Sequence, residues 1–187
     1  MTTDTITQDI ADIVPERLQL NRHYDVERLQ QEVYEIVSSL TIPTYTYYSP
    51  VPLVFNVKDP ENHDWDSENM LKGCSYLKEI LSCFQTEITS VRLMRLASGA
   101  VVHEHRDPTL DAVYKEVVRL TLPIYSNSNT VFLLNGAAIN MNPGELWYMK
   151  LSEPHSVHNN DQMERINMSI DLVWNDWLSN WFAEHLT

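Results

Sequence analysis

The spacing of hydrophobic residues changes along the chain from a helical period to a strict alternation. A first amphipathic helix, capped by the carboxylate of Asp25, is predicted from the apolar positions Val26, Leu29, Val33, Ile36, Val37 and Leu40. A second helix, ending near Cys83, is predicted from Leu77, Ile80, Leu81 and Phe84. The segment NDWLSNWFAEHL predicts a third helix, capped by Asn175, whose tryptophans pack in the core.

Between the second and third helices the alternation has a period of two. Eight short strands are predicted, at residues 88–97, 100–106, 116–124, 130–134, 137–142, 145–150, 155–159 and 163–173. Asn135-Gly136 is a strong signal for a two-residue hairpin, and Pro143-Gly144 indicates another turn. This pattern predicts a mainly β protein, a β-sandwich or small barrel with helices against one face.

The remaining segments are polar or rich in turn residues. Residues 1–20 show little periodicity and are expected to form a polar N-terminal arm, which leaves residues 21–187 as a single domain. Residues 43–55 combine Tyr, Thr and Val with three prolines and predict short edge strands. The stretch NVKDPENHDWDSEN that follows predicts a surface loop, with a lid over a site as the alternative.

Composition and charge narrow the classes of function. The chain has 187 residues, 43% hydrophobic and 21% charged, as in ordinary folded proteins. A formal net charge of −13 repels phosphate backbones and argues against nucleic acid as a partner. We expect neither a secretory signal nor a membrane anchor, because the first residues lack a basic start and no apolar run is long enough. Cys74 and Cys83 fall on opposite faces of a predicted helix, and two unpaired thiols fit a reducing cytoplasm.

Candidate metal ligands lie in the alternating region. Alternate side chains of an extended segment share a face, so His103, His105 and Asp107 point the same way. One His-x-Asp pair is a weak signal, but His155 begins another predicted strand 48 residues after Asp107, with His158 as a competitor. Two imidazoles and one carboxylate suit a metal that must also bind O2 and a cosubstrate, because neighbouring coordination positions stay open.

The last predicted strand has one polar and one apolar face. Its polar positions are Arg165, Asn167, Ser169 and Asp171, which alternate with Ile166, Met168, Ile170 and Leu172. A solvated outer face is the more common explanation of such a pattern, and a polar barrel interior is the alternative. Residues 117–124 alternate in the same way and place Arg119 and Thr121 on a polar face.

An ordered set of motifs between about Arg92 and Trp177 resembles a known family. The motifs are RLASGAVVHEHRD, VRLTLPIYSN, PGELWY, HSVHN and the arginine of ERINMSIDLVWNDW. Together they are specific, whereas any single one is not. The chain is similar to the aspartyl/asparaginyl β-hydroxylase family of Fe(II)- and 2-oxoglutarate-dependent dioxygenases, which includes bacterial proline hydroxylases.

The resemblance implies a double-stranded β-helix, a jelly-roll or cupin-like fold with flanking helices. It also implies an enzyme that uses Fe(II), 2-oxoglutarate and O2, with His105, Asp107 and His155 as metal ligands. The family's first histidine follows a glycine by six positions, as His105 follows Gly99, which favours His105 over His103. Arg165 matches the residue that receives the far carboxylate of 2-oxoglutarate, a role that suits the fork of an arginine.

Two departures from the family bear on the substrate. Asp107 is present, whereas the animal membrane-bound aspartyl hydroxylases lack the carboxylate ligand, so the triad looks more like that of the proline hydroxylases. Thr121 stands where those aspartyl enzymes have a second histidine near the cosubstrate. A carboxylate at Asp107 also argues against halogenation, because chloride needs that coordination position.

The expected reaction is hydroxylation of an unactivated C–H bond in an amino acid or a small derivative, with release of succinate and CO2. Arg119 is the leading candidate to hold a substrate carboxylate, ahead of Arg92 and Arg95, for which a surface charge or salt bridge is the alternative. Two other functions stay open: hydroxylation of aspartyl or asparaginyl residues in a peptide or protein, and a cupin-like metal-binding protein without 2-oxoglutarate chemistry. The sequence carries no signal for an oligomeric state.

Overall fold

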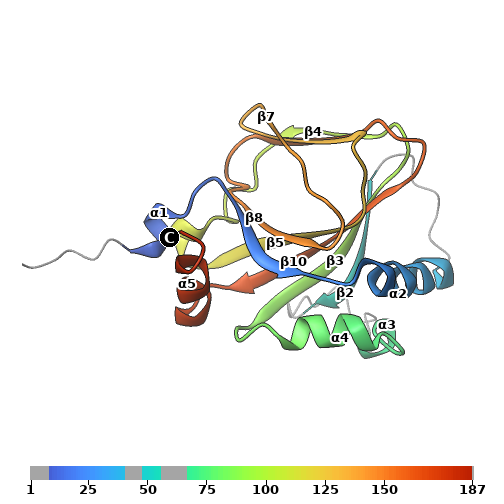
Figure 1. Ribbon diagram of the computed structural model, residues 1–187, viewed down its shortest axis with the longest axis horizontal. Coiled ribbons are helices and arrows are strands. Elements are labelled where there is room, and N and C mark those ends of the chain that lie inside the picture. Colours follow the sequence, from blue (N-terminus) through green and yellow to red (C-terminus); the bar gives the residue numbers. More distant parts are fainter. Residues whose placement is uncertain (1–8, 41–47, 56–66, 187) are drawn as a thin grey trace, which may run out of the picture.

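The computed structural model describes residues 9–40, 48–55 and 67–186 and consists of two antiparallel sheets that face each other (Figure 1). The six-stranded sheet has the order β1-β8-β5-β10-β3-β2, and the four-stranded sheet has the order β4-β9-β6-β7. The strands are β1 (Arg17–His23), β2 (Tyr48–Phe55), β3 (Ile88–Leu96), β4 (Val101–His105), β5 (Val117–Tyr125), β6 (Thr130–Leu134), β7 (Ala137–Ile139), β8 (Glu145–Met149), β9 (His155–Asn159) and β10 (Arg165–Val173). This is the mainly β, jelly-roll fold, a double-stranded β-helix, that the sequence analysis predicts.

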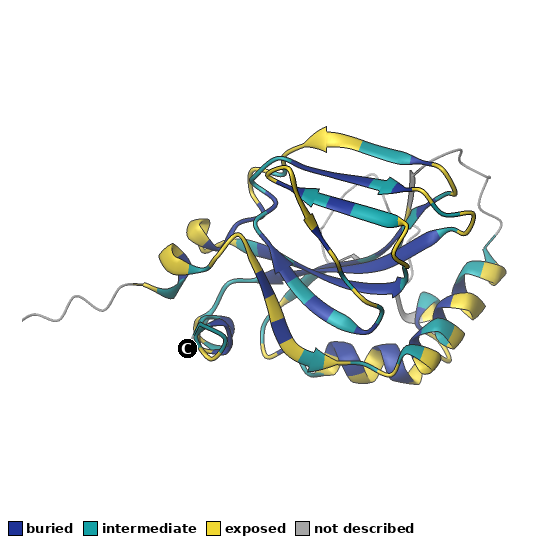
Figure 2. Cartoon of the chain, turned by 45° about the horizontal axis from the view of Figure 1, so that its top comes forward, coloured by how far each residue is buried: buried dark blue, intermediate teal, exposed yellow. Residues whose placement is uncertain are grey.

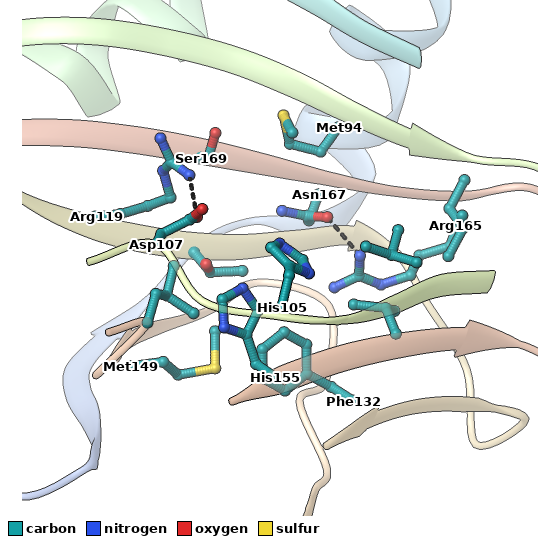
Figure 3. Close-up of a pocket in the computed structure, with 15 residues that line it drawn as sticks. Met94, His105, Asp107, Arg119, Phe132, Met149, His155, Arg165, Asn167 and Ser169 are labelled. Atoms are coloured by element: carbon teal, nitrogen blue, oxygen red, sulfur yellow. Dashed lines mark hydrogen bonds and ion pairs between the residues drawn. The ribbon is translucent and has the colours of Figure 1, made fainter. Parts of the chain in front are cut away.

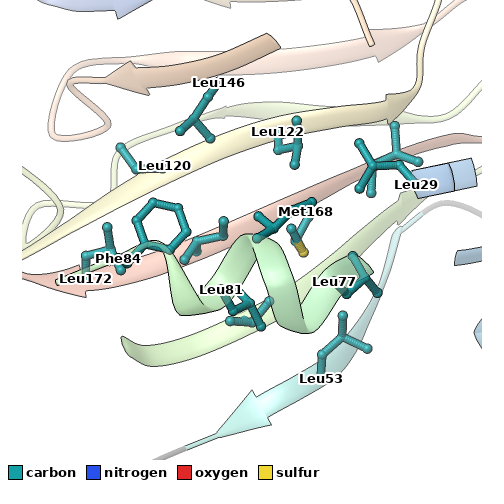
Figure 4. Close-up of a cluster of buried hydrophobic side chains, with 14 of the residues drawn as sticks. Leu29, Leu53, Leu77, Leu81, Phe84, Leu120, Leu122, Leu146, Met168 and Leu172 are labelled. Atoms are coloured by element: carbon teal, nitrogen blue, oxygen red, sulfur yellow. The ribbon is translucent and has the colours of Figure 1, made fainter. Parts of the chain in front are cut away.

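Helices cover the outer face of the six-stranded sheet, as Figures 1 and 4 show. The helices are α1 (Ile10–Ile13), α2 (Val26–Ser39), α3 (Ser67–Met70), α4 (Ser75–Ser82), the 3-10 helix η1 (Ala112–Tyr114) and α5 (Asp176–Ala183). Leu29 of α2 and Leu77 of α4 are fully buried against Leu120 of β5 and Met168 of β10. Full burial of one such side chain contributes about 1.5–3 kcal/mol, so this face holds most of the apolar stabilisation.

The inner face of the six-stranded sheet is turned toward the four-stranded sheet. A smaller apolar cluster joins the two sheets, with Leu96 and Met149 from the first and Phe132, Leu134 and Val157 from the second. Figure 2 shows the consequence for exposure: the central strands of the large sheet are dark along their length, whereas β4 at the edge of the small sheet is largely exposed. The central strands are therefore buried on both faces.

The predicted elements agree with the structure except at the N-terminus, in β7, and at the short helices α3 and η1, which were not predicted. The Asn135-Gly136 hairpin is confirmed, since both residues have the positive φ angles of a two-residue turn, 49° and 73°. Part of the expected polar arm is strand β1, which pairs with β8 and buries Leu18 and Leu20. Two alternating leucines are too short a pattern to predict a strand from sequence. β7 covers only part of the predicted 137–142, and the proposed lid loop lies outside the described residues, except for its last residues.

Both predicted caps are present, and one helix is capped from outside itself. Asp25 accepts hydrogen bonds from the backbone of α2, and Asn175 accepts one from Leu178 in α5. Cys74 precedes α4 without capping it by its side chain. Glu32 of α2 instead accepts hydrogen bonds from the backbone amides of Tyr76 and Leu77 in the first turn of α4. This contact fixes α2 and α4 to each other on the outer face of the sheet.

The predicted edge strands and cysteine positions are confirmed only in part. Of the predicted 43–55, residues 48–55 form the single strand β2 at an edge of the six-stranded sheet, and 43–47 lie outside the described residues. Cys74 and Cys83 flank α4 at its two ends instead of lying on opposite faces of it, and both thiols are free. Among the described residues, no helix is long and apolar enough to cross a membrane.

Gly144 allows a test of how the N-terminal segment is attached to the barrel. Its φ is +83°, and a Cβ placed there meets the carbonyl oxygen of Tyr24 at 2.6 Å, whereas a Cβ at Gly99, with φ +71°, meets nothing within 4 Å. Both substitutions by alanine add backbone strain, but only Gly144→Ala adds a clash with backbone, which costs about 1–3 kcal/mol more. We expect urea unfolding to show Gly144→Ala as the less stable variant by that amount. Equal destabilisation by Gly99→Ala would contradict the contact with Tyr24.

Candidate metal centre

Two histidines face each other across neighbouring strands of the small sheet. In the antiparallel pairing of β4 with β9, His105 lies directly opposite His155. The centroids of the two imidazole rings are 4.2 Å apart. Phe132 of β6 stacks against His155, with ring planes 11° apart and centroids at 6.1 Å, which restricts rotation of that imidazole. The strand register, which local periodicity does not show, thus brings together residues fifty positions apart in the sequence.

Hydrogen bonds determine which nitrogen of each imidazole is available. The Nδ1 atom of His105 is 2.8 Å from the carbonyl oxygen of His103, and that of His155 is 3.0 Å from the carbonyl oxygen of Glu153. A carbonyl oxygen only accepts, so each Nδ1–H must be the donor. The lone pair of each ring is therefore on Nε2, which is the arrangement of a metal-binding histidine whose other nitrogen is held by a backbone carbonyl.

Asp107 lies two residues beyond the end of β4. Its backbone N–H donates to the carbonyl oxygen of Leu151 at 2.8 Å, and Arg106 donates to Ser152 at 2.9 Å. These bonds tie the end of β4 to the segment that leads into β9. As a result, one ligand atom each of His105, Asp107 and His155 lies within 4.8 Å of the other two.

The competing histidines remain outside this group. His103 is exposed, and neither His103 nor His158 lines the cavity next to the three residues. The irregular pairing of β4 with β9 between Val102 and His105 breaks the simple alternation of faces that placed His103 beside His105. The structure therefore brings together the set that the glycine spacing favours.

Burial sets the charge state of the deepest member of the group. His155 is 5% exposed, and burial lowers its pKa, with the neighbouring His105 acting in the same direction. The neutral imidazole, the form that binds metal, is therefore favoured. His105 is exposed and Asp107 half-buried, so the group is open to solvent on one side only.

A cavity of about 80 Å³ extends from the three residues between the sheets (Figure 3). Its polar lining comes mainly from alternate positions of β10 and β5: Thr121, Arg165, Asn167 and Ser169, each no more than 6% exposed. The more common explanation of the β10 pattern, a solvated outer face, is therefore wrong. The polar face is inside because helices cover the other face, which leaves the interior as the only place for these side chains.

Arg165 lies at one end of this cavity and is held in place by a neighbour. It is 5% exposed, and its Nη1 donates to Oδ1 of Asn167 at 2.6 Å. Asn167 is itself buried on the same face of β10, two residues along. The contact orients the guanidinium group inside a largely apolar enclosure, where a bound carboxylate would interact strongly with it.

Arg119 lies on the other side of the His105 ring from Arg165 (Figure 3). It forms two hydrogen bonds with Asp171, at 2.6 and 2.8 Å, and one with Asp107 at 3.3 Å. Arg92 also contacts Asp171, at 3.0 Å. The salt-bridge alternative that the sequence analysis weighed for Arg92 is therefore what the structure has, and Arg119 too is engaged in ion pairs.

Arg95 lies on the opposite face of its strand from Arg92. Arg92 pairs with Ser169 on the cavity face of β10, whereas Arg95 pairs with Ile166 on the face that packs against the helices. Its Nε and Nη2 bind both carboxylate oxygens of Glu164, at 2.9 and 3.1 Å. The structure does not bring Arg95 to the metal group, in line with the salt-bridge alternative.

A second, open cleft of about 570 Å³ adjoins the first cavity. It shares Asp107 and Arg119 with that cavity, and Arg92, Asp171 and the exposed Glu116 lie on its other walls. The Asp107–Arg119 ion pair is therefore the boundary between the enclosed cavity and the cleft. The sequence analysis missed Asp171 as the partner of both arginines, although its place on the polar face of β10 was visible.

The donor set fits a divalent metal of the iron type. Two Nε2 lone pairs and a carboxylate oxygen converge from one side, which is the ligand set of non-haem Fe(II) oxygenases. Ser169 supplies a second sign that the cavity takes a ligand, because its buried Oγ has no hydrogen-bond partner among the described residues.

The comparisons with known proteins agree with this fold. The family model described as aspartyl/asparaginyl beta-hydroxylase matches residues 61–175. Similar solved structures include a 2OG-Fe(II) oxygenase family oxidoreductase from Burkholderia pseudomallei, with a TM-score of 0.53, 13% identity and 89% of each chain covered. Another is the non-heme alpha-ketoglutarate dependent epimerase SnoN from nogalamycin biosynthesis, with a TM-score of 0.54, 10% identity, and 87% of this chain and 80% of that chain covered. No curated protein matches.

The match covers more than half of the chain and identifies its class. The protein is an enzyme of the 2-oxoglutarate and Fe(II) oxygenase class, a hydroxylase. It belongs to the aspartyl/asparaginyl beta-hydroxylase family. The solved structures, at these low identities, support the fold.

The histidines offer a matched pair of variants to test the metal group. We expect His105→Ala to weaken Co²⁺ binding by more than about 100-fold, since even loss of an outer-shell partner costs about 10- to 100-fold. His103→Ala removes an exposed imidazole two residues away but keeps the carbonyl that orients His105, so it should bind Co²⁺ like the wild type. Isothermal titration of the metal-stripped protein measures both. Equal weakening by the two variants would argue against the assignment.

Proposed function

We propose that the protein is an Fe(II)- and 2-oxoglutarate-dependent dioxygenase that hydroxylates an unactivated C–H bond of an amino acid or small amino-acid derivative. The observation that carries the proposal is one enclosed cavity with the metal group at its side and a buried, oriented arginine at its end. Family membership supports the reaction class. The proposed class of substrate is argued from the charged residues of the open cleft on the other side of Asp107.

In this proposal His105, Asp107 and His155 hold the iron. When bound, the iron together with 2-oxoglutarate and O2 supplies the oxidising power that converts C–H to C–OH, with release of succinate and CO2. The protein positions the reactants and keeps water out. Three ligands on one side of the iron leave room for the cosubstrate, and Phe132, stacked against His155, shields the site.

Arg165 is the proposed anchor for the far carboxylate of 2-oxoglutarate. Its guanidinium group is buried and is oriented by Asn167. A bound carboxylate would therefore form charge-assisted, bidentate hydrogen bonds with a group that is already in position. The hydroxyl of Ser169 and the buried Thr121 line the same cavity and can add hydrogen bonds. A cupin that only stores a metal has no need of this arginine.

The substrate is proposed to bind in the open cleft on the other side of the metal group. Arg165 and Asp171 are six residues apart on β10, which is about 20 Å of strand, so cosubstrate and substrate can bind separate cationic groups with the metal between them. The cleft offers the half-buried Arg92 for a carboxylate and the exposed Glu116 for an ammonium group. This mixed charge suits a zwitterionic amino acid.

Arg92 takes the role that the sequence analysis gave first to Arg119. Arg119 is engaged on three nitrogens, by Asp171 and Asp107. Arg92 has one hydrogen bond to Asp171, and its buried Nε has no hydrogen-bond partner among the described residues. A substrate carboxylate can therefore be accepted by Arg92 without separating Arg119 from the metal group.

Cosubstrate binding tests the role of Arg165. We expect Arg165→Gln to lose at least about 10-fold in 2-oxoglutarate affinity, because a hydrogen bond to a charged group contributes about 1.5–3 kcal/mol. Anaerobic titration with Fe(II) and 2-oxoglutarate, followed by the visible charge-transfer band of the chelate, gives the affinity. The control is Arg95→Gln, which removes a nearby strand cation on the outer face. A wild-type protein that binds the metal but not 2-oxoglutarate would favour the cupin-like alternative.

Substrate binding is tested by succinate release and a mass gain of one oxygen, with free amino acids and with peptides. For an accepted amino acid we expect Arg92→Gln to raise KM by about 10-fold or more with a smaller change in kcat, as loss of uniform binding does. Arg95→Gln should leave KM unchanged. Turnover of peptides alone would favour the alternative of a peptide or protein residue as substrate.

A further inference from the structure

Four charged side chains form a continuous network along the wall between the cavity and the cleft. Asp171 accepts hydrogen bonds from Nε and Nη2 of Arg119, at 2.6 and 2.8 Å, and from Nη2 of Arg92 at 3.0 Å. Nη1 of Arg119 then donates to Oδ2 of Asp107 at 3.3 Å. Asp171 is thus the central member, and it is one step removed from a candidate metal ligand.

The strand register builds this network. Asp171 on β10 lies directly opposite Arg119 on β5, with both side chains on the inner face of the sheet. The guanidinium group is planar, and Asp171 binds two of its nitrogens from one carboxylate. Because the plane is rigid, this grip fixes the direction of the third nitrogen, which points at Asp107 (Figure 3).

The burial of Asp171 argues for more than a structural ion pair. Asp171 is 7% exposed, and removing a carboxylate from water carries a large desolvation penalty that apolar residues would avoid. In the network two positive and two negative side chains balance. Without the charge of Asp171, two arginines would stand beside Asp107, and the excess positive charge would disfavour a divalent cation there.

We propose that Asp171 is a positioning residue for the metal centre, acting through Arg119 on the carboxylate of Asp107. Arg119 binds one oxygen of Asp107, Oδ2, which keeps the side chain in one orientation and would leave the other oxygen for a metal. Asp171 in turn holds Arg119 and cancels its charge. The inference rests on the proposed metal centre and adds to it a residue that is not itself one of the three metal ligands.

Co²⁺ binding to the metal-stripped protein tests the inference without turnover. Asp171→Asn keeps the size of the side chain but loses its charge and one acceptor, and we expect a 10- to 100-fold weaker Kd together with an altered visible Co²⁺ spectrum. The control Arg95→Gln breaks a two-point ion pair on the other face of β3 and should change neither quantity. His105→Ala gives the level of adventitious binding.

A double-mutant cycle separates positioning from a general structural effect. In an Arg119→Gln background, Asp171→Asn should change the Co²⁺ Kd by less than about threefold, because its route to Asp107 is already lost. An equal loss in both backgrounds would show that Asp171 does not act through Arg119 and would overturn the inference. If Asp171→Asn does not fold, Asp171→Glu serves in its place: one added methylene moves the guanidinium, and wild-type Co²⁺ affinity in that variant would also overturn it.

The outcomes distinguish this inference from the proposed function. A wild-type protein that does not bind Co²⁺ above the His105→Ala level overturns the metal centre and the role of Asp171 with it. A wild-type protein that binds Co²⁺, with Asp171→Asn binding as tightly, leaves the metal centre intact and overturns only the positioning role.

Discussion

The six-stranded sheet is covered on both faces, by helices on its outer face and by the four-stranded sheet on its inner face. The rest of the structure depends on that constraint. The outer face of β10 presents Ile166, Met168 and Ile170 to the helices, where the main apolar core lies. Its inner face then has no access to solvent, so polar residues there must find partners or a ligand. In the candidate site, arginines and carboxylates are partners for one another, and the cavity leaves room for a ligand.

Pairing of the inner polar groups divides them into two sets. Asp171 pairs with both Arg119 and Arg92, and together with Asp107 the four charges balance, which makes one end of the interior rigid. At the other end, Arg165 is oriented by the neutral amide of Asn167, and the Oγ of Ser169 has no partner among the described residues. Preorganised donors in an enclosed site are suited to an anionic ligand, because they need not reorganise when it binds.

Much of the site was visible in the sequence, for local reasons. The spacing of Gly99, His105 and Asp107 and the ordered motifs pointed to the ligand group, and alternation in 163–173 identified the residues that line the cavity. The direction of that polar face was misjudged, because alternation shows that two faces differ and not which of them is covered. β1 was missed because its two buried leucines give too short a pattern.

The sequence by itself determined the helices α2, α4 and α5, the strands from β3 onward, the hairpin turn, the helix caps and the family, because these depend on residues close together in the chain. Only the tertiary structure decided that His105 lies opposite His155, that Arg95 faces away from the cavity and that Arg119 joins Asp171 to Asp107. These features depend on strand order and register. Both are set by packing between segments distant in sequence, which local periodicity does not specify.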